Sequence, residues 1–239
     1  MKKFLLSVSM LVVFLTAIQA QTEVTVAEAG TLRQLVEEPI SEINSLKVKG
    51  PINGTDLRFL RELCGISVSG GPSNGRLTDL DLSEARIVAG GDYYMYDYST
   101  YEEFFTSNDE LGIYAFFNCP VIESITLPST LKKVGTSAFS SCARLGNIEV
   151  PETNETFYSI DGSLYSRADA KLIKYPQSRN LRHFIVPEGT KIIGYDAISD
   201  ALSLELVTLP EGLTTIERTA FCFSNNLTNI DIPSTLHNS

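Results

Sequence analysis

The sequence predicts a β-rich solenoid of 23-residue repeats that follows a small α/β cap over residues 21–75. The first observation is a short apolar motif that ends in proline and returns every 23 residues. The second is an Ala-Phe pair that keeps the same spacing. A unit of this length cannot bury its own apolar residues, so it becomes stable only when neighbouring units stack on it.

Residues 1–20 have the composition of a secretory signal peptide. Lys2 and Lys3 precede an apolar run from Phe4 to Ile18, which ends at Ala20. No later segment approaches the roughly 18 apolar residues of a membrane-spanning helix, so none is predicted. We expect an exported protein that begins near Gln21 and is secreted or held at the cell surface, with the outer membrane and the periplasm as alternatives.

The charge of the chain argues against two classes of partner. The formal net charge is −10, and losing two lysines with the signal peptide makes it −12. Proteins that bind nucleic acids neutralise phosphates with clustered Lys and Arg, and we find no basic stripe. No nucleic-acid partner is predicted, and an anionic membrane surface is disfavoured for the same reason.

The predicted cap contains two short helices with a strand between them. Thr31 and Gln34 fit a capping box at the start of the first helix. A strand follows over residues 43–48, and a second helix begins after Asn53-Gly54. Solenoids need such a segment to cover the open end of the first coil.

Residues 76–239 form the predicted solenoid, and its two landmarks recur in register. The segment Ile125–Pro128 returns as Ile148–Pro151, and Ala115-Phe116 returns as Ala138-Phe139. A second block keeps the period with the segments Phe184–Pro187, Val207–Pro210 and Ile230–Pro233.

Two insertions interrupt the repeats. Residues 91–110 form a tyrosine-rich insertion, and residues 152–180 form a predicted β-meander whose Asp161-Gly162 pair is a hairpin signal. We expect the meander to bulge from the solenoid without interrupting the stack.

The segment Val134–Pro151 follows the pattern Ile-Gly-x-x-Ala-Phe-x-x-Cys-x-x-Leu-x-x-Ile-x-Leu-Pro almost position for position. In this the chain resembles the BspA-like leucine-rich repeat family of bacterial surface proteins over about residues 76–236. The resemblance implies a β-rich leucine-rich-repeat solenoid. It also implies adhesion to extracellular proteins, although no residue selects a ligand.

Two of the four cysteines are predicted to stack in the core. Cys119 and Cys142 both stand three residues after the Phe of an Ala-Phe pair, so they should stack between coils. Parallel side chains in adjacent coils lack the torsion of a disulfide, which favours unpaired thiols over a bridge. Cys222 is out of register. No Cys-x-x-Cys pair exists, and we predict neither a metal site nor a cofactor.

The inventory of reactive residues does not favour an enzyme. The chain has two histidines, His183 and His237, and it lacks phosphate-binding and nucleophile-elbow motifs. We therefore predict no catalytic residues. One alternative is an exported glycoside-processing enzyme with two carboxylates on the strand face, about 5 to 10 Å apart. A truncated relic of a longer adhesin is another.

Two surfaces are the candidate binding sites for an extracellular protein or glycan. Side chains alternate along a strand, so the residue between two inward positions should face solvent. The tyrosine-rich insertion is either a recognition loop or packing against the cap. The strand face contains Asp81, Thr126, Glu149, Lys174, Ile185, Thr208 and Asp231, and the aromatic loop contains Tyr93, Tyr94, Tyr96, Tyr98 and Tyr101.

The last coil begins at Ile230 and stops before an Ala-Phe return. An open strand edge of this kind pairs readily with another chain. We expect either end-to-end self-association or a frayed final coil.

Overall fold

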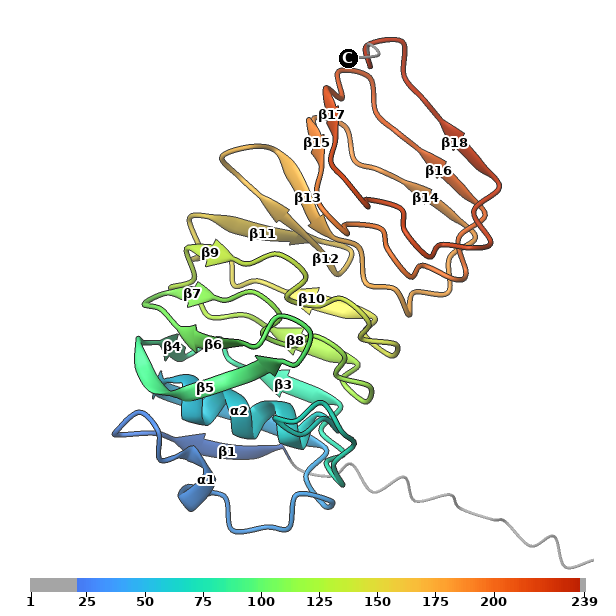
Figure 1. The fold of residues 1–239 in the computed structure, drawn as a ribbon. Coiled ribbons are helices and arrows are strands. Elements are labelled where there is room, and N and C mark those ends of the chain that lie inside the picture. Colours follow the sequence, from blue (N-terminus) through green and yellow to red (C-terminus); the bar gives the residue numbers. More distant parts are fainter. Residues whose placement is uncertain (1–20, 237–239) are drawn as a thin grey trace, which may run out of the picture.

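The structure is a computed structural model that describes residues 21–236, so the signal-peptide prediction and His237 lie outside the described residues. Its coils stack above an α/β cap, as the sequence predicted (Figure 1). Among the described residues, none of the helices has the length and apolar character needed to cross a membrane.

The cap is built on two parallel strands, β1 (Thr22–Thr25) and β2 (Ser45–Ile52). Helix α1 (Leu32–Leu35) lies between them in the chain, and α2 (Gly54–Leu63) follows β2. Strand β1 was not expected from the sequence. Because β2 also pairs in parallel with the first coil strand, β3 (Asp79–Asp81), the sheet of the cap continues into the solenoid.

The predicted capping box at Thr31 is wrong, because the Thr31 side chain makes no cap hydrogen bond and its hydroxyl donates to the carbonyl of Glu28. The buried carboxylate of Asp56 in α2 replaces it, accepting from the amides of Gly30 (2.6 Å) and Leu32 (2.9 Å). Asp56 also completes a true capping box with Asn53. A neighbouring helix therefore supplies what a local motif was expected to supply.

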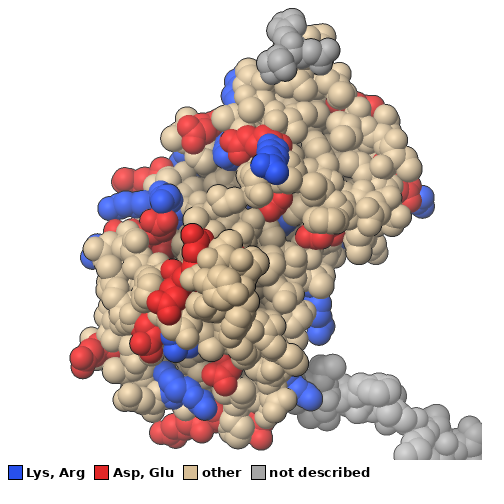
Figure 2. All heavy atoms as spheres, viewed as in Figure 1, with Lys and Arg blue, Asp and Glu red and all other residues tan. Residues whose placement is uncertain are grey.

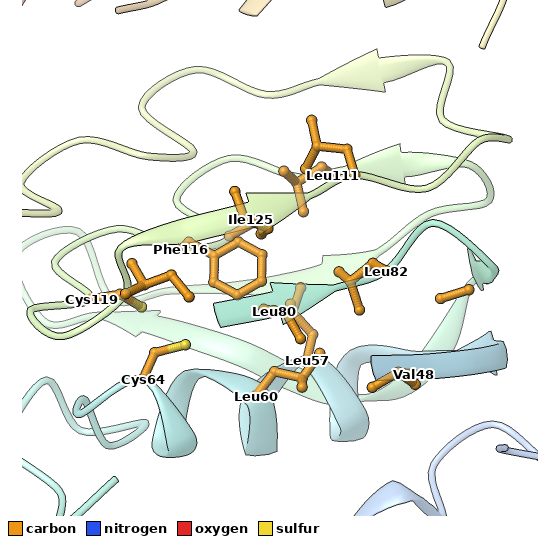
Figure 3. Close-up of a cluster of buried hydrophobic side chains, with 14 of the residues drawn as sticks. Val48, Leu57, Leu60, Cys64, Leu80, Leu82, Leu111, Phe116, Cys119 and Ile125 are labelled. Atoms are coloured by element: carbon orange, nitrogen blue, oxygen red, sulfur yellow. The ribbon is translucent and has the colours of Figure 1, made fainter. Parts of the chain in front are cut away.

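The first block of coils confirms the 23-residue register. In parallel pairing, Ile125 lies beside Ile148, and Leu80 lies beside Ile125. These inward residues are buried and form the core with the apolar face of α2 (Figure 3). The strands of this block after β3 are β4 (Ala85–Ile87), β5 (Gly90–Asp97), β6 (Glu102–Thr106), β7 (Glu110–Leu111), β8 (Ser124–Thr126), β9 (Lys133–Val134) and β10 (Asn147–Glu149).

The Ala-Phe pairs of the first block and the two cysteines that follow them fill the core as predicted. The rings of Phe116 and Phe139 are stacked with centroids 6.2 Å apart and planes only 2° from parallel. Cys119 and Cys142 are buried free thiols, and the Cys142 Sγ donates to the carbonyl of Phe116 at 2.9 Å. Burial raises the pKa of Cys142, so this thiol stays protonated and unreactive.

The meander consists of β11 (Phe157–Ile160), β12 (Ser163–Ser166) and β13 (Lys171–Lys174), paired antiparallel as expected. The expectation that it leaves the stack uninterrupted is wrong. In the described residues β10 is the last strand of its sheet, and the amide of Ile148 donates instead to Gly162 in the turn of the meander. The meander therefore ends one sheet, because its hairpin takes the place of the next coil strand.

The second block forms a separate solenoid segment. Its coil strands β14 (His183–Ile185), β16 (Leu206–Thr208) and β18 (Asn229–Asp231) make a three-stranded parallel sheet. On another side, β13 pairs with β15 (Ile192–Ile193), which pairs with β17 (Thr215–Ile216). The buried apolar residues accordingly divide into two clusters, with the boundary between Leu164 and Tyr165.

Candidate binding surfaces

The predicted strand face exists as two separate rows. Asp81, Thr126 and Glu149 lie side by side on β3, β8 and β10. Ile185, Thr208 and Asp231 lie side by side on β14, β16 and β18. The expectation of one continuous strand face is wrong, because the meander separates the two sheets.

Polar contacts run along both rows. The Lys47 ammonium lies 3.4 Å from Asp81, so this carboxylate is already partly neutralised. In the second row, the Thr208 hydroxyl donates to Asp231 at 3.1 Å, and the ring of His183 lies 2.8 Å from the same hydroxyl. Ile185 beside them is 64% exposed, which leaves an apolar side chain open to a partner.

Lys174 does not belong to this face, and its assignment there is a correction. It lies on β13, where Leu172 and Lys174 point inward, and it is only 4% exposed. Its ammonium donates to the carbonyls of Asp196 (3.2 Å) and Ser199 (3.5 Å) and to the Ser199 hydroxyl (3.1 Å). Burial lowers the pKa of Lys174 to about 8. The side chain is inward because the meander strand joins another sheet, where the alternation has the opposite phase.

The tyrosine-rich insertion is an antiparallel hairpin, β5 paired with β6. Its base packs against the cap, as the packing interpretation required. Tyr94 is buried and donates to the carbonyl of Ile113 at 2.7 Å, so its assignment to a binding surface is wrong. Tyr93 is half-buried, and the Arg58 guanidinium covers its ring at 4.3 Å from the centroid.

The tip of the hairpin has the exposed aromatic side chains that a recognition loop would need. Tyr98 is 60% exposed and Tyr101 is 78% exposed, and Phe105 on β6 also faces solvent. The half-buried Tyr96 stacks edge-on against Tyr98, with ring centroids 4.6 Å apart. Figure 2 shows acidic side chains beside this uncharged tip. The insertion therefore combines a buried anchor with an exposed aromatic end.

A third surface arises where one coil lacks its Ala-Phe turn. Adjacent turns are normally joined by backbone hydrogen bonds, such as Asn118 to Ser140 and Asp200 to Cys222. Between the turns 137–141 and 196–200, the meander contributes Tyr175, whose amide donates to Ala197. No complete turn fills this level of the stack, so a cleft opens between the two blocks.

The side chain of Asp196 spans this cleft and separates it into two parts. Its carboxylate accepts from the hydroxyls of Ser137 (2.8 Å) and Ser140 (3.4 Å). On one side is a cavity of about 370 Å³ between the first block and the meander. Its rim contains Lys132, Lys133 and Lys171, each paired with a carboxylate.

On the other side is a larger groove of about 580 Å³, called the acidic groove below. It runs from the hairpin along the turns on both sides of the level that lacks a complete turn. Burial, followed by the nearby Asp97 and Asp196 carboxylates, raises the pKa of Tyr114 in its wall. The lining residues are Met95, Asp97, Ser99, Tyr114, Phe117, Ser137, Ser140, Ser141, Tyr195, Asp196, Ser199, Asp200 and Phe223.

Sequence reasoning missed the acidic groove. The only local signal was the lack of an Ala-Phe pair in residues 152–180, and this signal shows a missing turn without showing what surrounds it. Among the described residues, no three His, Cys, Asp or Glu side chains are grouped so that they could hold a metal ion.

Comparison with known proteins identifies the repeat. The model of the BspA type leucine rich repeat region matches residues 91–178 and 174–239, with six copies of the repeat. No curated protein matches the chain.

A solved structure shares the fold of this chain. A crystal structure of the pneumococcal vaccine antigen PcpA matches 82% of this chain with a TM-score of 0.56 and 24% identity. A leucine-rich cell surface protein from Faecalibacterium prausnitzii matches 90% of the chain with a TM-score of 0.46 and 17% identity. The chain spans 40% of the first protein and 65% of the second.

Proposed function

Because this chain belongs to the BspA-type leucine-rich repeat family, we propose that it is an exported module that binds an extracellular protein or glycan. The signal-peptide composition of residues 1–20 supports export. Repeat proteins of this architecture recognise partners through extended surfaces built from successive coils, which supports a binding role.

The single observation that carries the proposal is the exposed aromatic tip of the hairpin. Tyr98 and Tyr101 gain little from folding, because most of each side chain stays in water. The buried Tyr94 and the Arg58–Tyr93 contact hold the base of the hairpin against the cap, so the tip is presented on a fixed support. Rigid aromatic side chains offer large contact area at low entropic cost, which is typical of recognition surfaces.

The two strand rows offer further contact area. Glu149, Ile185 and Asp231 are exposed, and Asp81, Thr126 and Thr208 are half-exposed beside them. We assign these rows a supporting role in binding, since repeat proteins commonly use extended faces of this kind for recognition.

The test is an array of extracellular matrix proteins and glycans probed with residues 21–239. We expect at least one partner, and we expect a Tyr98→Ala/Tyr101→Ala variant to lose most of its binding with unchanged thermal stability. The control is Tyr158→Ala, which alters a tyrosine of the meander outside the three surfaces. An array on which no partner distinguishes the wild type from the hairpin variant would refute the proposal.

Export can be tested separately, by measuring the mass of the mature protein. The mass of the protein recovered from its natural compartment should correspond to a chain that starts at or near Gln21. A mass that retains residues 1–20 would contradict export and, with it, an extracellular partner.

The proposal assigns no reaction to the chain. Asp169 and Asp196 both line the smaller cavity. Glycoside hydrolysis, which uses two carboxylates, is therefore the reaction that could contradict the proposal. Steady hydrolysis of aryl glycosides by purified protein, lost in an Asp169→Asn variant, would replace a binding role with the glycoside-processing alternative.

We also propose end-to-end self-association. Among the described residues, β18 pairs with β16 and with no other strand, and Ile232 beside it is 63% exposed. Light scattering over a concentration series should show a rising mass. An Ile232→Lys variant should stay monomeric, and a wild type that is monomeric at all concentrations would end the idea.

A further inference from the structure

The acidic groove combines three carboxylates with a row of aromatic rings and has no Lys or Arg in its lining. We propose that the acidic groove binds arginine or lysine side chains of an extended segment of an extracellular protein. This inference rests on the proposed binding function and adds to it the location and charge of the partner.

The charge balance of the groove favours a cation. Asp97, Asp196 and Asp200 come from the hairpin and from one coil turn, so three negative charges converge on one space. Two buried cations lie behind the walls of the groove. The Lys174 ammonium donates to the carbonyls of Asp196 and Ser199, and the Arg61 guanidinium donates to the carbonyls of Tyr114 and Phe117. Two positive charges against three negative charges leave the groove negative. A bound guanidinium would neutralise these groups through charge-assisted hydrogen bonds, which a neutral glycan cannot do.

The aromatic residues suit the same ligand. Tyr114 and Phe117 pack edge-on with ring centroids 5.3 Å apart at one end of the groove, and Tyr195 and Phe223 line its other part. Cations bind over the faces of such rings, and arginine does so most often. Carboxylates beside aromatic rings therefore give a guanidinium both a charge partner and a stacking surface.

The stability of the fold does not account for the Phe at position 223. It is 70% exposed, and its backbone is left-handed with φ 60°. Asn118, Ser141 and Asp200 occupy the equivalent position in other coils, also with positive φ. A bulky residue is unfavourable in this conformation, whereas Asn tolerates it. Since Phe223 neither buries its ring nor suits its backbone, we assign it to ligand contact.

The shape of the groove indicates an extended ligand. Its walls come from the hairpin and from the turns around residues 117, 140, 199 and 223, two on each side of the level that lacks a complete turn. An extended peptide places alternate side chains on one face about 6 to 7 Å apart, so several can enter a groove that follows the stacking axis.

The experiment measures binding of a fluorescein-labelled hexa-arginine peptide to residues 21–239 by fluorescence anisotropy at low salt. Hexa-citrulline is the neutral probe of the same shape. We expect hexa-arginine to bind at least about tenfold more tightly than hexa-citrulline. An Asp97→Asn/Asp200→Asn variant should weaken hexa-arginine binding about tenfold. Asn retains the oxygen that caps Ser99 and accepts the left-handed backbone at residue 200, so the variant should fold.

Phe223→Asn separates binding from folding. Relief of the left-handed backbone should leave thermal stability equal to or above that of the wild type, while hexa-arginine binding weakens about fivefold. A variant that loses stability and keeps its affinity would show that Phe223 has a structural role.

The matched control is Glu152→Gln/Asp161→Asn, which removes the same charge from exposed positions of the meander. If it weakens binding as much as the groove variant does, the peptide responds only to net charge and the inference is overturned. Equal binding of hexa-citrulline would also overturn it. If an array finds a glycan whose binding the groove variant abolishes while hexa-arginine fails, the proposed function stands and the cationic partner is wrong.

Discussion

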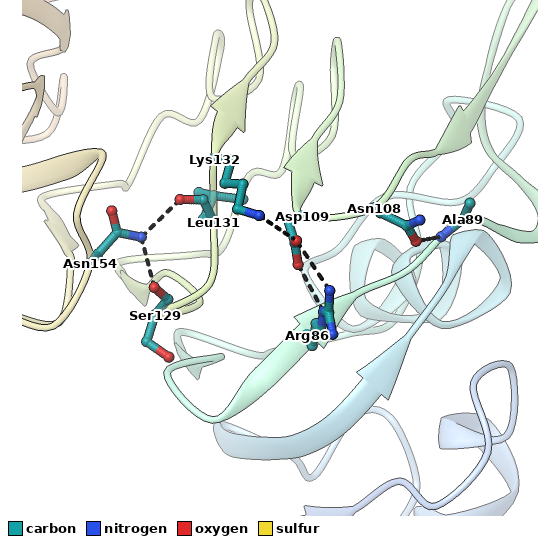
Figure 4. A network of polar contacts seen from close by, with 8 residues as sticks. All are labelled: Arg86, Ala89, Asn108, Asp109, Ser129, Leu131, Lys132 and Asn154. Atoms are coloured by element: carbon teal, nitrogen blue, oxygen red, sulfur yellow. Dashed lines mark hydrogen bonds and ion pairs between the residues drawn. The ribbon is translucent and has the colours of Figure 1, made fainter. Parts of the chain in front are cut away.

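Asn154 lies where the first block of coils meets the meander, and its buried side chain joins them (Figure 4). The amide nitrogen lies 3.0 to 3.2 Å from the carbonyls of Pro128, Ser129 and Leu131. Its oxygen accepts from the amides of Thr156 and Phe157. One side chain thus satisfies backbone groups on both sides of the insertion.

We predict that Asn154→Ala lowers the free energy of unfolding by about 3 kcal/mol, because several buried carbonyls and amides lose their partner. Asn226→Ala is the control. Asn226 also donates to a backbone carbonyl, that of Leu202, but it is exposed, so its loss should cost about 0.5 kcal/mol or less. Urea melts of the two variants give both values, and equal losses would contradict the joining role of Asn154.

The burial of Lys174 makes stability depend on pH. Its pKa of about 8 lies below the ordinary value of 10.5, so between these values the folded chain binds fewer protons than the unfolded chain. The free energy of unfolding therefore rises with pH in this window, and the cost of burying the charged amine is fully present below about pH 8.

We predict that this contribution adds about 2 kcal/mol of stability between about pH 7 and pH 9.5. The measurement is the difference in unfolding free energy between wild type and Lys174→Met, in which other titrating groups cancel. Lys191→Met, at an exposed position, should keep the slope of the wild type. A difference that does not change with pH would mean that Lys174 is already neutral or reaches water.

At the scale of elements, the sequence predicted the features that depend on repetition. The strand motif recurs from coil to coil together with the Ala-Phe pair, which is Ala197-Ile198 in one coil, and parallel pairing converts that period directly into register. The cap was predicted less well. Whether β1 pairs with β2, and whether Asp56 caps α1, depends on contacts across more than 20 residues, which local patterns do not encode.

The stacked rings of successive turns are the element-scale prediction. Phe139→Ala should lower the free energy of unfolding by about 3 to 5 kcal/mol, because truncation leaves a cavity against the parallel ring of Phe116. Phe105→Ala removes the same ring from a 52% exposed position and should cost far less. Denaturant melts decide it, and similar losses for both variants would contradict the assigned register.

The candidate surfaces follow the same division between local and distant information. The exposed rows were predicted because side chains alternate along every strand, and this rule failed for Lys174 because its strand belongs to another sheet. Similarly, the composition of residues 91–110 predicted an aromatic surface but did not show that Tyr94 is buried and Tyr98 exposed. The acidic groove comes from a turn that one level of the stack lacks, so no motif in the sequence marks it.

At the scale of the whole molecule, the meander divides one solenoid into two cores. The second block leans away from the axis of the first in Figure 1, and its buried cluster is the smaller one. Hydrogen bonds cross the junction between the two cores, such as Ser178 to Leu145 through the backbone and Ser137 to Asp196 through side chains. In a solenoid each coil is stabilised by its neighbours, so a weak junction should uncouple the two halves.

We therefore predict that the second block opens without the first, and native-state hydrogen exchange can show it. Leu127 and Val186 are matched probes, because both amides follow a coil strand and donate to the next coil. Leu204→Ala, in the second core, should destabilise that block by about 2 to 5 kcal/mol and speed exchange at Val186 about thirtyfold or more. Exchange at Leu127 should not change, because opening of the second block leaves its hydrogen bond to Glu149 intact. If Leu204→Ala speeds exchange equally at both amides, the chain unfolds as one unit and the meander does not divide it.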